Sequence, residues 1–120
     1  MRAISTFPQI YFCRRFVDFR KSINGLSEIA EQELKFAPFS GALFIFISRR
    51  RDKIKILYWD KSGFAIWYKR LEEAKFAWPK NIEEDATSIS MTGEQLEWLL
   101  NGIDIWKIKP HKELLFESLS

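Results

Sequence analysis

The stretch that decides the fold is residues 53–71, KIKILYWDKSGFAIWYKRL. Two runs of apolar, β-branched and aromatic residues flank Asp60-Lys61-Ser62-Gly63, a sequence typical of the turn between two antiparallel strands. Gly63 is expected to supply the positive φ of a three-residue loop with a bulge, and Asp60 to occupy the first turn position. We therefore predict a β-hairpin as the scaffold of the protein.

Hydrophobic periodicity predicts further elements on both sides of this hairpin. Strands are expected at residues 10–12, 42–48, 53–59, 64–70, 76–78 and 87–91, and helices at residues 19–34 and from Thr92 to near Gly102. Asp18 is the expected N-cap of the first helix, while Thr92 and Gln95 have the spacing of a capping box. The order β-α-β-β-β-β-β-α predicts an α+β fold, with an antiparallel sheet of about four to six strands and two amphipathic helices.

Length and composition indicate one domain. The chain has 120 residues, of which 47% are hydrophobic, enough for a core without disulfide or metal staples. We place the domain at about residues 12–103 of the single unit 1–120, with a C-terminal tail at 104–120. The lone Cys13 fits a reducing compartment, and no apolar run is long enough to cross a membrane. The expected location is the cytoplasm, with no membrane partner.

The register of the hairpin assigns its side chains to two faces. With a bulge at Gly63, Tyr58 lies opposite Ile66, and a tight turn at 49–52 sets Phe46 opposite Lys55 and Ile47 opposite Ile54. One face is then the core, expected beneath both helices: Leu43, Ile45, Ile47, Ile54, Ile56, Tyr58, Phe64, Ile66 and Tyr68. The other face carries Phe44, Phe46, Leu57, Trp59, Ala65 and Trp67, with Lys55 opposite Lys69.

Two interpretations of this second face stay open. Aromatic rings interleaved with lysines can stack on bases and bind phosphate, which makes Phe44, Phe46, Trp59 and Trp67 candidate stacking or interface residues. Alternatively, another part of the chain or a second copy covers the face while the lysines reach past it to solvent.

Residues for catalysis or metal binding do not form a recognisable group. His111 is the only histidine, and one cysteine plus one histidine cannot complete a zinc site. No glycine-rich loop has phosphate-cradling spacing. The aspartates are each better explained as cap, turn or loop residues than as ligands of a two-metal site. We expect no enzyme activity, no cofactor and no metal.

Basic residues are concentrated in the first 70 positions, although the net charge is only +3. The largest cluster is Arg49, Arg50 and Arg51, hereafter the arginine triplet. Such clusters either bind the DNA backbone or form an ordinary solvated surface. The candidate DNA-binding residues are Arg49, Arg50, Arg51, Lys53, Lys55, Lys69 and Arg70.

A longer set of motifs resembles a known family. Its members here are Asp18-x-Arg20-Lys21, Pro38-Phe39-Ser40-Gly41, Leu57-Tyr58-Trp59-Asp60 with Gly63-Phe64, Trp67-Tyr68-Lys69-Arg70-Leu71, Phe76-x-Trp78-Pro79 and Leu96-x-Trp98-Leu99-Leu100-x-Gly102. Together they resemble the TnpB (Orf2-like) accessory proteins of IS 66-type insertion sequences. The resemblance implies a small cytoplasmic protein, encoded beside a larger transposase that carries the acidic catalytic triad, and needed for transposition without cutting DNA itself.

The sequence thus supports two functional hypotheses. The first is a non-catalytic accessory protein of DNA transposition that binds DNA, the transposase or both. The alternative is a pure protein-interaction module, either a homodimer or a transposase-docking unit, without DNA binding.

Overall fold

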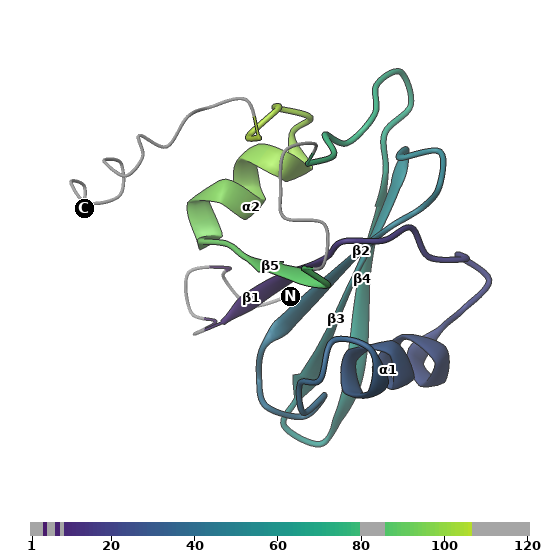
Figure 1. Ribbon diagram of the computed structural model, residues 1–120, viewed down its shortest axis with the longest axis vertical. Helices are drawn as coiled ribbons and strands as arrows, with labels where there is room; N and C mark the ends of the chain where they lie inside the picture. Colours follow the sequence, from purple (N-terminus) through teal and green to yellow (C-terminus); the bar gives the residue numbers. More distant parts are fainter. Residues whose placement is uncertain (1–3, 5–6, 8, 80–85, 107–120) are drawn as a thin grey trace.

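The computed structural model describes residues 4, 7, 9–79 and 86–106, which form five strands and two helices. The elements are β1 (Ile10–Cys13), α1 (Ile23–Gln32), β2 (Leu43–Ile47), β3 (Lys53–Asp60), β4 (Gly63–Arg70), β5 (Ser88–Ser90) and α2 (Gly93–Leu100). The strands make one sheet in the order β4-β3-β2-β1-β5 (Figure 1). The predicted α+β class and strand number are confirmed. No helix among the described residues is long and apolar enough to cross a membrane.

The sheet is mixed, so the expectation of a purely antiparallel sheet is wrong in one place. β1 and β2 run parallel, with Ile10 beside Leu43 and Phe12 beside Ile45. A parallel neighbour requires the chain to cross back along the sheet, and α1 lies in that crossover. The apolar pattern of a strand does not record its direction, which is why the sequence did not show this.

The predicted strand at 76–78 is also wrong. The backbone N–H of Phe76 donates to the carbonyl of Arg51 at 2.6 Å, across the β2–β3 turn. Pro79, three residues later, has no N–H to extend a ladder. The buried Phe76 ring therefore anchors an irregular segment, and β5 is the next strand.

The hairpin register differs from the prediction by one residue. Asp60 pairs with Gly63 and Tyr58 with Ala65, which leaves a two-residue loop. Lys61, at φ 58°, supplies the positive φ expected of Gly63, so there is no bulge to offset the strands. A one-residue shift exchanges the two faces of β4. The predicted pairing of β2 with β3 is confirmed, with Phe46 opposite Lys55 and Ile47 opposite Ile54.

Each face of the sheet is covered by a different helix, contrary to the expectation that both cover one face (Figure 1). On one face α2 contributes Leu96, Leu99 and Leu100 to a cluster with Leu43, Ile45, Ile47, Ile54 and Ile56. On the other, α1 contributes Leu26, Ile29 and Ala30 to a cluster with Phe44, Phe46 and Leu57. Burial on both faces explains the continuously apolar sequence of β2.

The ends of α2 match the prediction, whereas the start of α1 does not. Thr92 and Gln95 form the capping box. After α2, Gly102 adopts φ 82°, and Ile103 N–H donates to the Trp98 carbonyl at 3.0 Å, a Schellman ending. The N-cap of α1 is Ser22 rather than Asp18, because Asp18 is engaged in a separate turn with Arg20. The acidic segment 82–85 and the tail from residue 107 lie outside the described residues.

Candidate nucleic-acid interface

The sheet topology brings cations from distant parts of the sequence to one end of the sheet. Because β1 and β2 are parallel, Arg14 after β1 and the arginine triplet after β2 emerge at the same end. The antiparallel strands β3 and β4 add Lys53 and Arg70, which lie directly opposite each other. We call this group the basic end: Arg14, Arg49, Arg50, Arg51, Lys53, Arg70 and Lys75.

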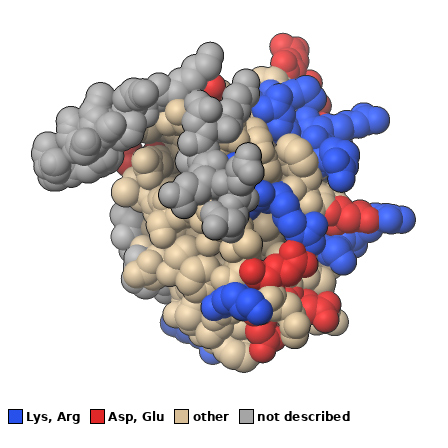
Figure 2. All heavy atoms as spheres, viewed as in Figure 1, with Lys and Arg blue, Asp and Glu red and all other residues tan. Residues whose placement is uncertain are grey.

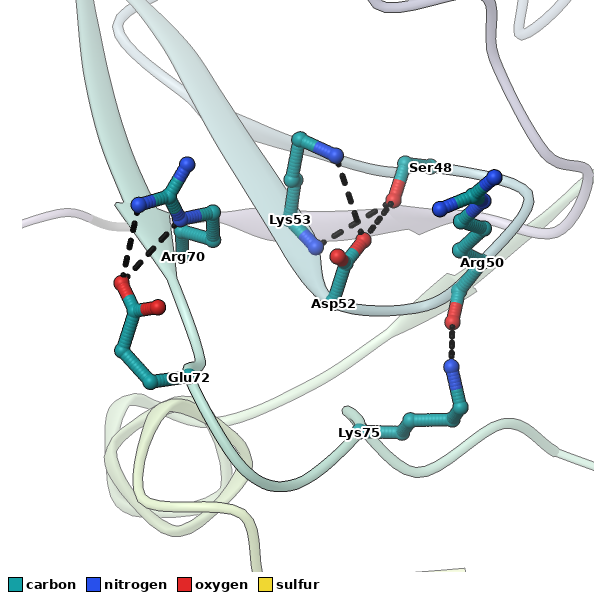
Figure 3. A network of polar contacts seen from close by, with 7 residues as sticks. All are labelled: Ser48, Arg50, Asp52, Lys53, Arg70, Glu72 and Lys75. Carbon is teal, nitrogen blue, oxygen red and sulfur yellow. Dashed lines mark hydrogen bonds and ion pairs between the residues drawn. The ribbon is translucent and has the colours of Figure 1, made fainter.

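In Figure 2, Lys and Arg gather on the upper right, where Figure 1 shows the β2–β3 turn and the segment that follows β4. Lys75 was missed by sequence reasoning. It precedes the buried Phe76, and its ammonium donates to the Arg50 carbonyl at 2.7 Å (Figure 3). Lys75 is exposed and the next residue, Phe76, is buried. This polar–apolar step in the sequence is the signal that could have placed Lys75 beside the β2–β3 turn.

A polar network fixes the turn that carries the arginine triplet (Figure 3). The Ser48 hydroxyl donates to Asp52 Oδ1 at 3.2 Å and accepts from the Lys53 backbone N–H at 3.2 Å. Burial acts to raise the pKa of Asp52, but the positive charge of Lys53, 3.4 Å away, and the hydrogen bond from Ser48 outweigh it and lower that pKa. Asp52 is therefore a carboxylate at neutral pH, and it partly neutralises Lys53.

The arginine triplet keeps its positive charge uncompensated. Within the described ranges no acidic side chain forms an ion pair with Arg49, Arg50 or Arg51, whereas Arg70 is paired with Glu72 at 3.1 Å. Arg49 and Arg50 are exposed. Three guanidinium groups on one fixed turn give this end of the sheet a positive potential that can attract an anion.

A cleft of about 370 Å³ opens beside the arginine triplet. It lies between the segment after β1 and the β2–β3 turn and is lined by Phe16, Val17, Asp18, Phe19, Ser48, Arg49, Arg50 and Lys53. The guanidinium carbon of Arg49 is 5.9 Å from the ring centroid of Phe16, whose ring also stacks on Trp78. Hydrogen bonds from Arg20 hold the pKa of Asp18 well below its usual range, so this rim carries one negative charge.

Lys55 and Lys69 do not face each other, so the predicted opposition of these lysines is wrong. Lys55 pairs with Tyr68 on the α1 side, and Lys69 pairs with Ile54 on the α2 side. The Lys55 ammonium donates to the carbonyls of Phe19 and Lys21 at 2.9 and 2.8 Å, and burial lowers its pKa.

The Lys69 ammonium donates to the Leu100 carbonyl at 2.8 Å, at the C-terminal end of α2 where a cation is favoured. Lys55 thus ties the segment before α1 to the sheet, and Lys69 ties α2 to it, so neither belongs to the basic end.

Comparison with known proteins assigns the chain to a family. The sequence model of the family described as IS66 Orf2 like protein matches residues 8–110. The chain belongs to this family. The resemblance seen in the sequence is thereby confirmed, and it associates this Orf2-like protein with the transposition of insertion sequences as an accessory protein.

Two relatives of the Orf2-like protein come from Sinorhizobium fredii. Uncharacterized protein y4jC is 34% identical over 93 residues, which cover 78% of this chain and 77% of the relative. Uncharacterized protein y4hO is 29% identical over 99 residues, which cover 82% of this chain and 83% of the relative. No solved structure matches the chain.

The candidate stacking residues of the Orf2-like protein do not share one open face. Phe44 and Phe46 are fully buried beneath α1, so their rings cannot reach a base. Trp67 is partly buried on the α2 side. Trp59 lies at the hairpin end of the sheet, in contact with Phe64 and with Phe39, which is 61% exposed.

Groups for catalysis are not assembled in the part of the Orf2-like protein that is described. Among those residues no three His, Cys, Asp or Glu side chains come together to hold a metal ion. Cys13 is buried in β1, and burial raises the pKa of its thiol, which disfavours the reactive thiolate. Asp85 and His111 lie outside the described residues. The arrangement of the basic end suits binding of an anion.

Proposed function

We propose that this protein serves transposition by binding the DNA backbone at its basic end without cutting DNA. The observation that carries the proposal is topological: β1, β2, β3 and β4 deliver cations from segments far apart in the sequence to one end of one sheet. Family membership supplies the setting, an insertion sequence whose chemistry requires DNA.

The proposed contact surface is smaller than the sequence suggested. It consists of Arg49, Arg50, Arg51, Lys53 and Arg70. It leaves out Lys55 and Lys69 because their ammonium groups are bonded to carbonyls away from the basic end. Arginines on a rigid turn bind phosphate oxygens in a bidentate manner, which positions a protein on DNA without selecting sequence. The neighbouring cleft, with the Phe16 ring beside Arg49, can accept one phosphate and its sugar.

The test is a fluorescence anisotropy titration of duplexes from the terminal repeats of the insertion sequence, with unrelated duplexes of equal length as reference. We expect affinity to fall steeply with salt, with a slope of about −0.9 for each phosphate contacted. The triple substitution Arg49→Glu, Arg50→Glu and Arg51→Glu should weaken binding by at least about tenfold and flatten that slope. If the triple variant binds as tightly as the parent, the basic end is not the DNA surface.

A charge-matched pair separates local contact from net charge. Arg50→Glu and Lys35→Glu change the net charge equally, and both side chains are exposed, but Lys35 follows α1 and is not part of the basic end. Arg50→Glu should lower affinity much more than Lys35→Glu. Equal losses would mean that overall charge alone governs binding.

A second candidate function is docking on the transposase without DNA contact. It is favoured by the aromatic cluster at the hairpin end, where Phe39 is 61% exposed and contacts Trp59 and Phe64. Exposed aromatic side chains are frequent anchors of protein interfaces. Under this alternative, Phe39→Ser abolishes co-purification with the transposase of the same element, while DNA affinity stays unchanged.

A further inference from the structure

β4 is a long edge strand with little protection against pairing. It lies at one end of the sheet order, and no strand in the described part of the chain pairs with its outer edge. Residues 64–68 are all apolar or aromatic, none is fully buried, and Tyr68 is 48% exposed. Exposed edges usually carry a central charge, a proline or a bulge that blocks another strand. β4 has none of these before Lys69.

The hydrogen bonds to β3 reveal which backbone groups of β4 point outward. Leu71 N–H donates to the Asp52 carbonyl at 2.8 Å, so in this antiparallel ladder the odd-numbered residues of β4 face β3. The N–H and C=O groups of Phe64, Ile66, Tyr68 and Arg70 consequently point away from the sheet. They form a regular row of donors and acceptors along the edge.

We propose that β4 pairs antiparallel with β4 of a second copy of this chain, about a two-fold axis that passes at Trp67. The two sheets then join into one continuous sheet, with equivalent faces on the same side. Phe64 lies opposite Arg70 of the second copy, and Ile66 lies opposite its Tyr68. In this register the outward N–H and C=O groups of all four residues find partners.

The side chains of β4 favour pairing of this edge with a second copy of the chain. No like charges meet: Arg70, whose guanidinium pairs with Glu72 of its own chain, lies opposite Phe64 of the second copy, and Lys69 lies opposite its Ala65. The exposed Glu73, just after β4 of one copy, and Lys61, in the hairpin turn of the other, then lie at the same end of the interface with opposite charges. A shift of the register by two residues in either direction leaves outward groups at one end of each strand unmatched.

The first measurement is sedimentation equilibrium of the full-length chain. We expect twice the 14.3 kDa mass of one chain in the micromolar range. A monomer at about 100 μM would overturn the proposal. The proposal would also be wrong if the chain stays monomeric alone and β4 pairs only with a strand of the transposase.

Cysteine cross-linking tests the register. Trp67→Cys places two thiols across the two-fold axis in a pair without hydrogen bonds, with Cα atoms about 4.5 Å apart, within the range of a disulfide. Ala65→Cys is the matched control on the same face, because its two copies lie four residues apart along the strands, about 13 Å. The native Cys13 is 1% exposed and does not interfere. Equal cross-linking of the two variants under mild oxidation would refute the register.

A backbone variant tests the edge itself. Ile66→Pro removes an outward N–H and spares the β3 ladder, so we expect a folded monomer with an unchanged far-UV circular dichroism spectrum. If this variant fails to fold, the cysteine pair still decides the question. The assembly does not depend on DNA binding, so the triple glutamate variant of the arginine triplet should remain a dimer.

Discussion

Asp18 shows how a nearby side chain can decide the role of a residue. Its Oδ1 atom accepts from the backbone N–H of Arg20 at 2.9 Å, and its Oδ2 atom accepts from the Arg20 guanidinium at 2.6 Å. These bonds to Arg20 hold the pKa of Asp18 well below its usual range. The carboxylate therefore stabilises the turn that leads the chain from β1 toward α1, on the rim of the cleft.

The contribution of Asp18 to stability should depend on pH. A carboxyl group whose pKa is lower in the folded state stabilises the fold above its unfolded pKa of about 3.9, and this contribution is lost as pH falls toward the folded pKa. Urea denaturation of the parent and of Asp18→Asn should therefore give a difference in unfolding free energy at pH 7 that shrinks below about pH 4. An equal difference at pH 7 and pH 3 would contradict this role. The effect is small because the pair is exposed.

The lysines illustrate which residue-level inferences the sequence supports. The sequence singled out Lys55 and Lys69 as cations on apolar strands. In the structure, the Lys55 ammonium is bonded to carbonyls of the segment before α1, and the Lys69 ammonium to a carbonyl of α2. Those partners are 31 to 36 residues away along the chain. Charge pattern alone cannot reveal such partners, since they depend on register and on the placement of each helix.

At the scale of elements, the hairpin turn carries backbone strain at Lys61. Its φ of 58° is in the left-handed region, which costs a residue with a side chain roughly 1–2 kcal/mol. Glycine is preferred at the first position of a two-residue loop of this kind. Lys61→Gly should therefore stabilise the protein by about 0.5–1 kcal/mol in chemical denaturation, after the entropy that glycine adds to the unfolded chain is subtracted.

Ser62→Gly is the control for this turn. Ser62 does not have a positive φ, so glycine there brings the entropic cost without relief of strain. We expect no stabilisation from Ser62→Gly. If both variants stabilise the protein equally, strain at Lys61 is not the cause.

The elements that the sequence predicted well are those fixed by local residues. The hairpin, β2 and α2 follow from apolar runs, turn residues and a capping box that lie within a few positions of one another. The parallel β1, the start of α1 and the one-residue shift of β4 depend on longer-range geometry or on which turn residue takes a positive φ. The shift had the largest effect, because it moved Trp67 away from the face of Phe44 and Phe46.

In the whole molecule, we expect the core to determine stability and the basic end to determine DNA binding, with little overlap between the two. Phe44 is fully buried between the sheet and α1, so Phe44→Ala should lower the free energy of unfolding by about 3–5 kcal/mol. Arg50 is exposed, so Arg50→Glu should change it by less than about 0.5 kcal/mol. Thermal melts and DNA titrations of both variants measure the two properties side by side.

The expected result is that Phe44→Ala, below its melting temperature, binds DNA as the parent does, whereas Arg50→Glu binds weakly with normal stability. Loss of DNA affinity in a folded Phe44→Ala protein would instead connect the α1 side of the sheet to binding. The gathering of cations at one end could not be predicted from the sequence, because it requires β1 and β2 to point the same way.

The position of β1 also bears on how the protein is made. Tyr11 lies beside Phe44 on one side and beside Ser90 on the other, so β1, which precedes the other described strands in the sequence, gains its second neighbour only after β5 has been synthesised. The β3–β4 hairpin, closed by two residues, forms at the lowest loop-closure cost, and β1 joins through distant contacts that form slowly. During synthesis the edge of β1 that later pairs with β5 therefore stays unpaired, and in that interval the chain is most prone to aggregate and most in need of a chaperone.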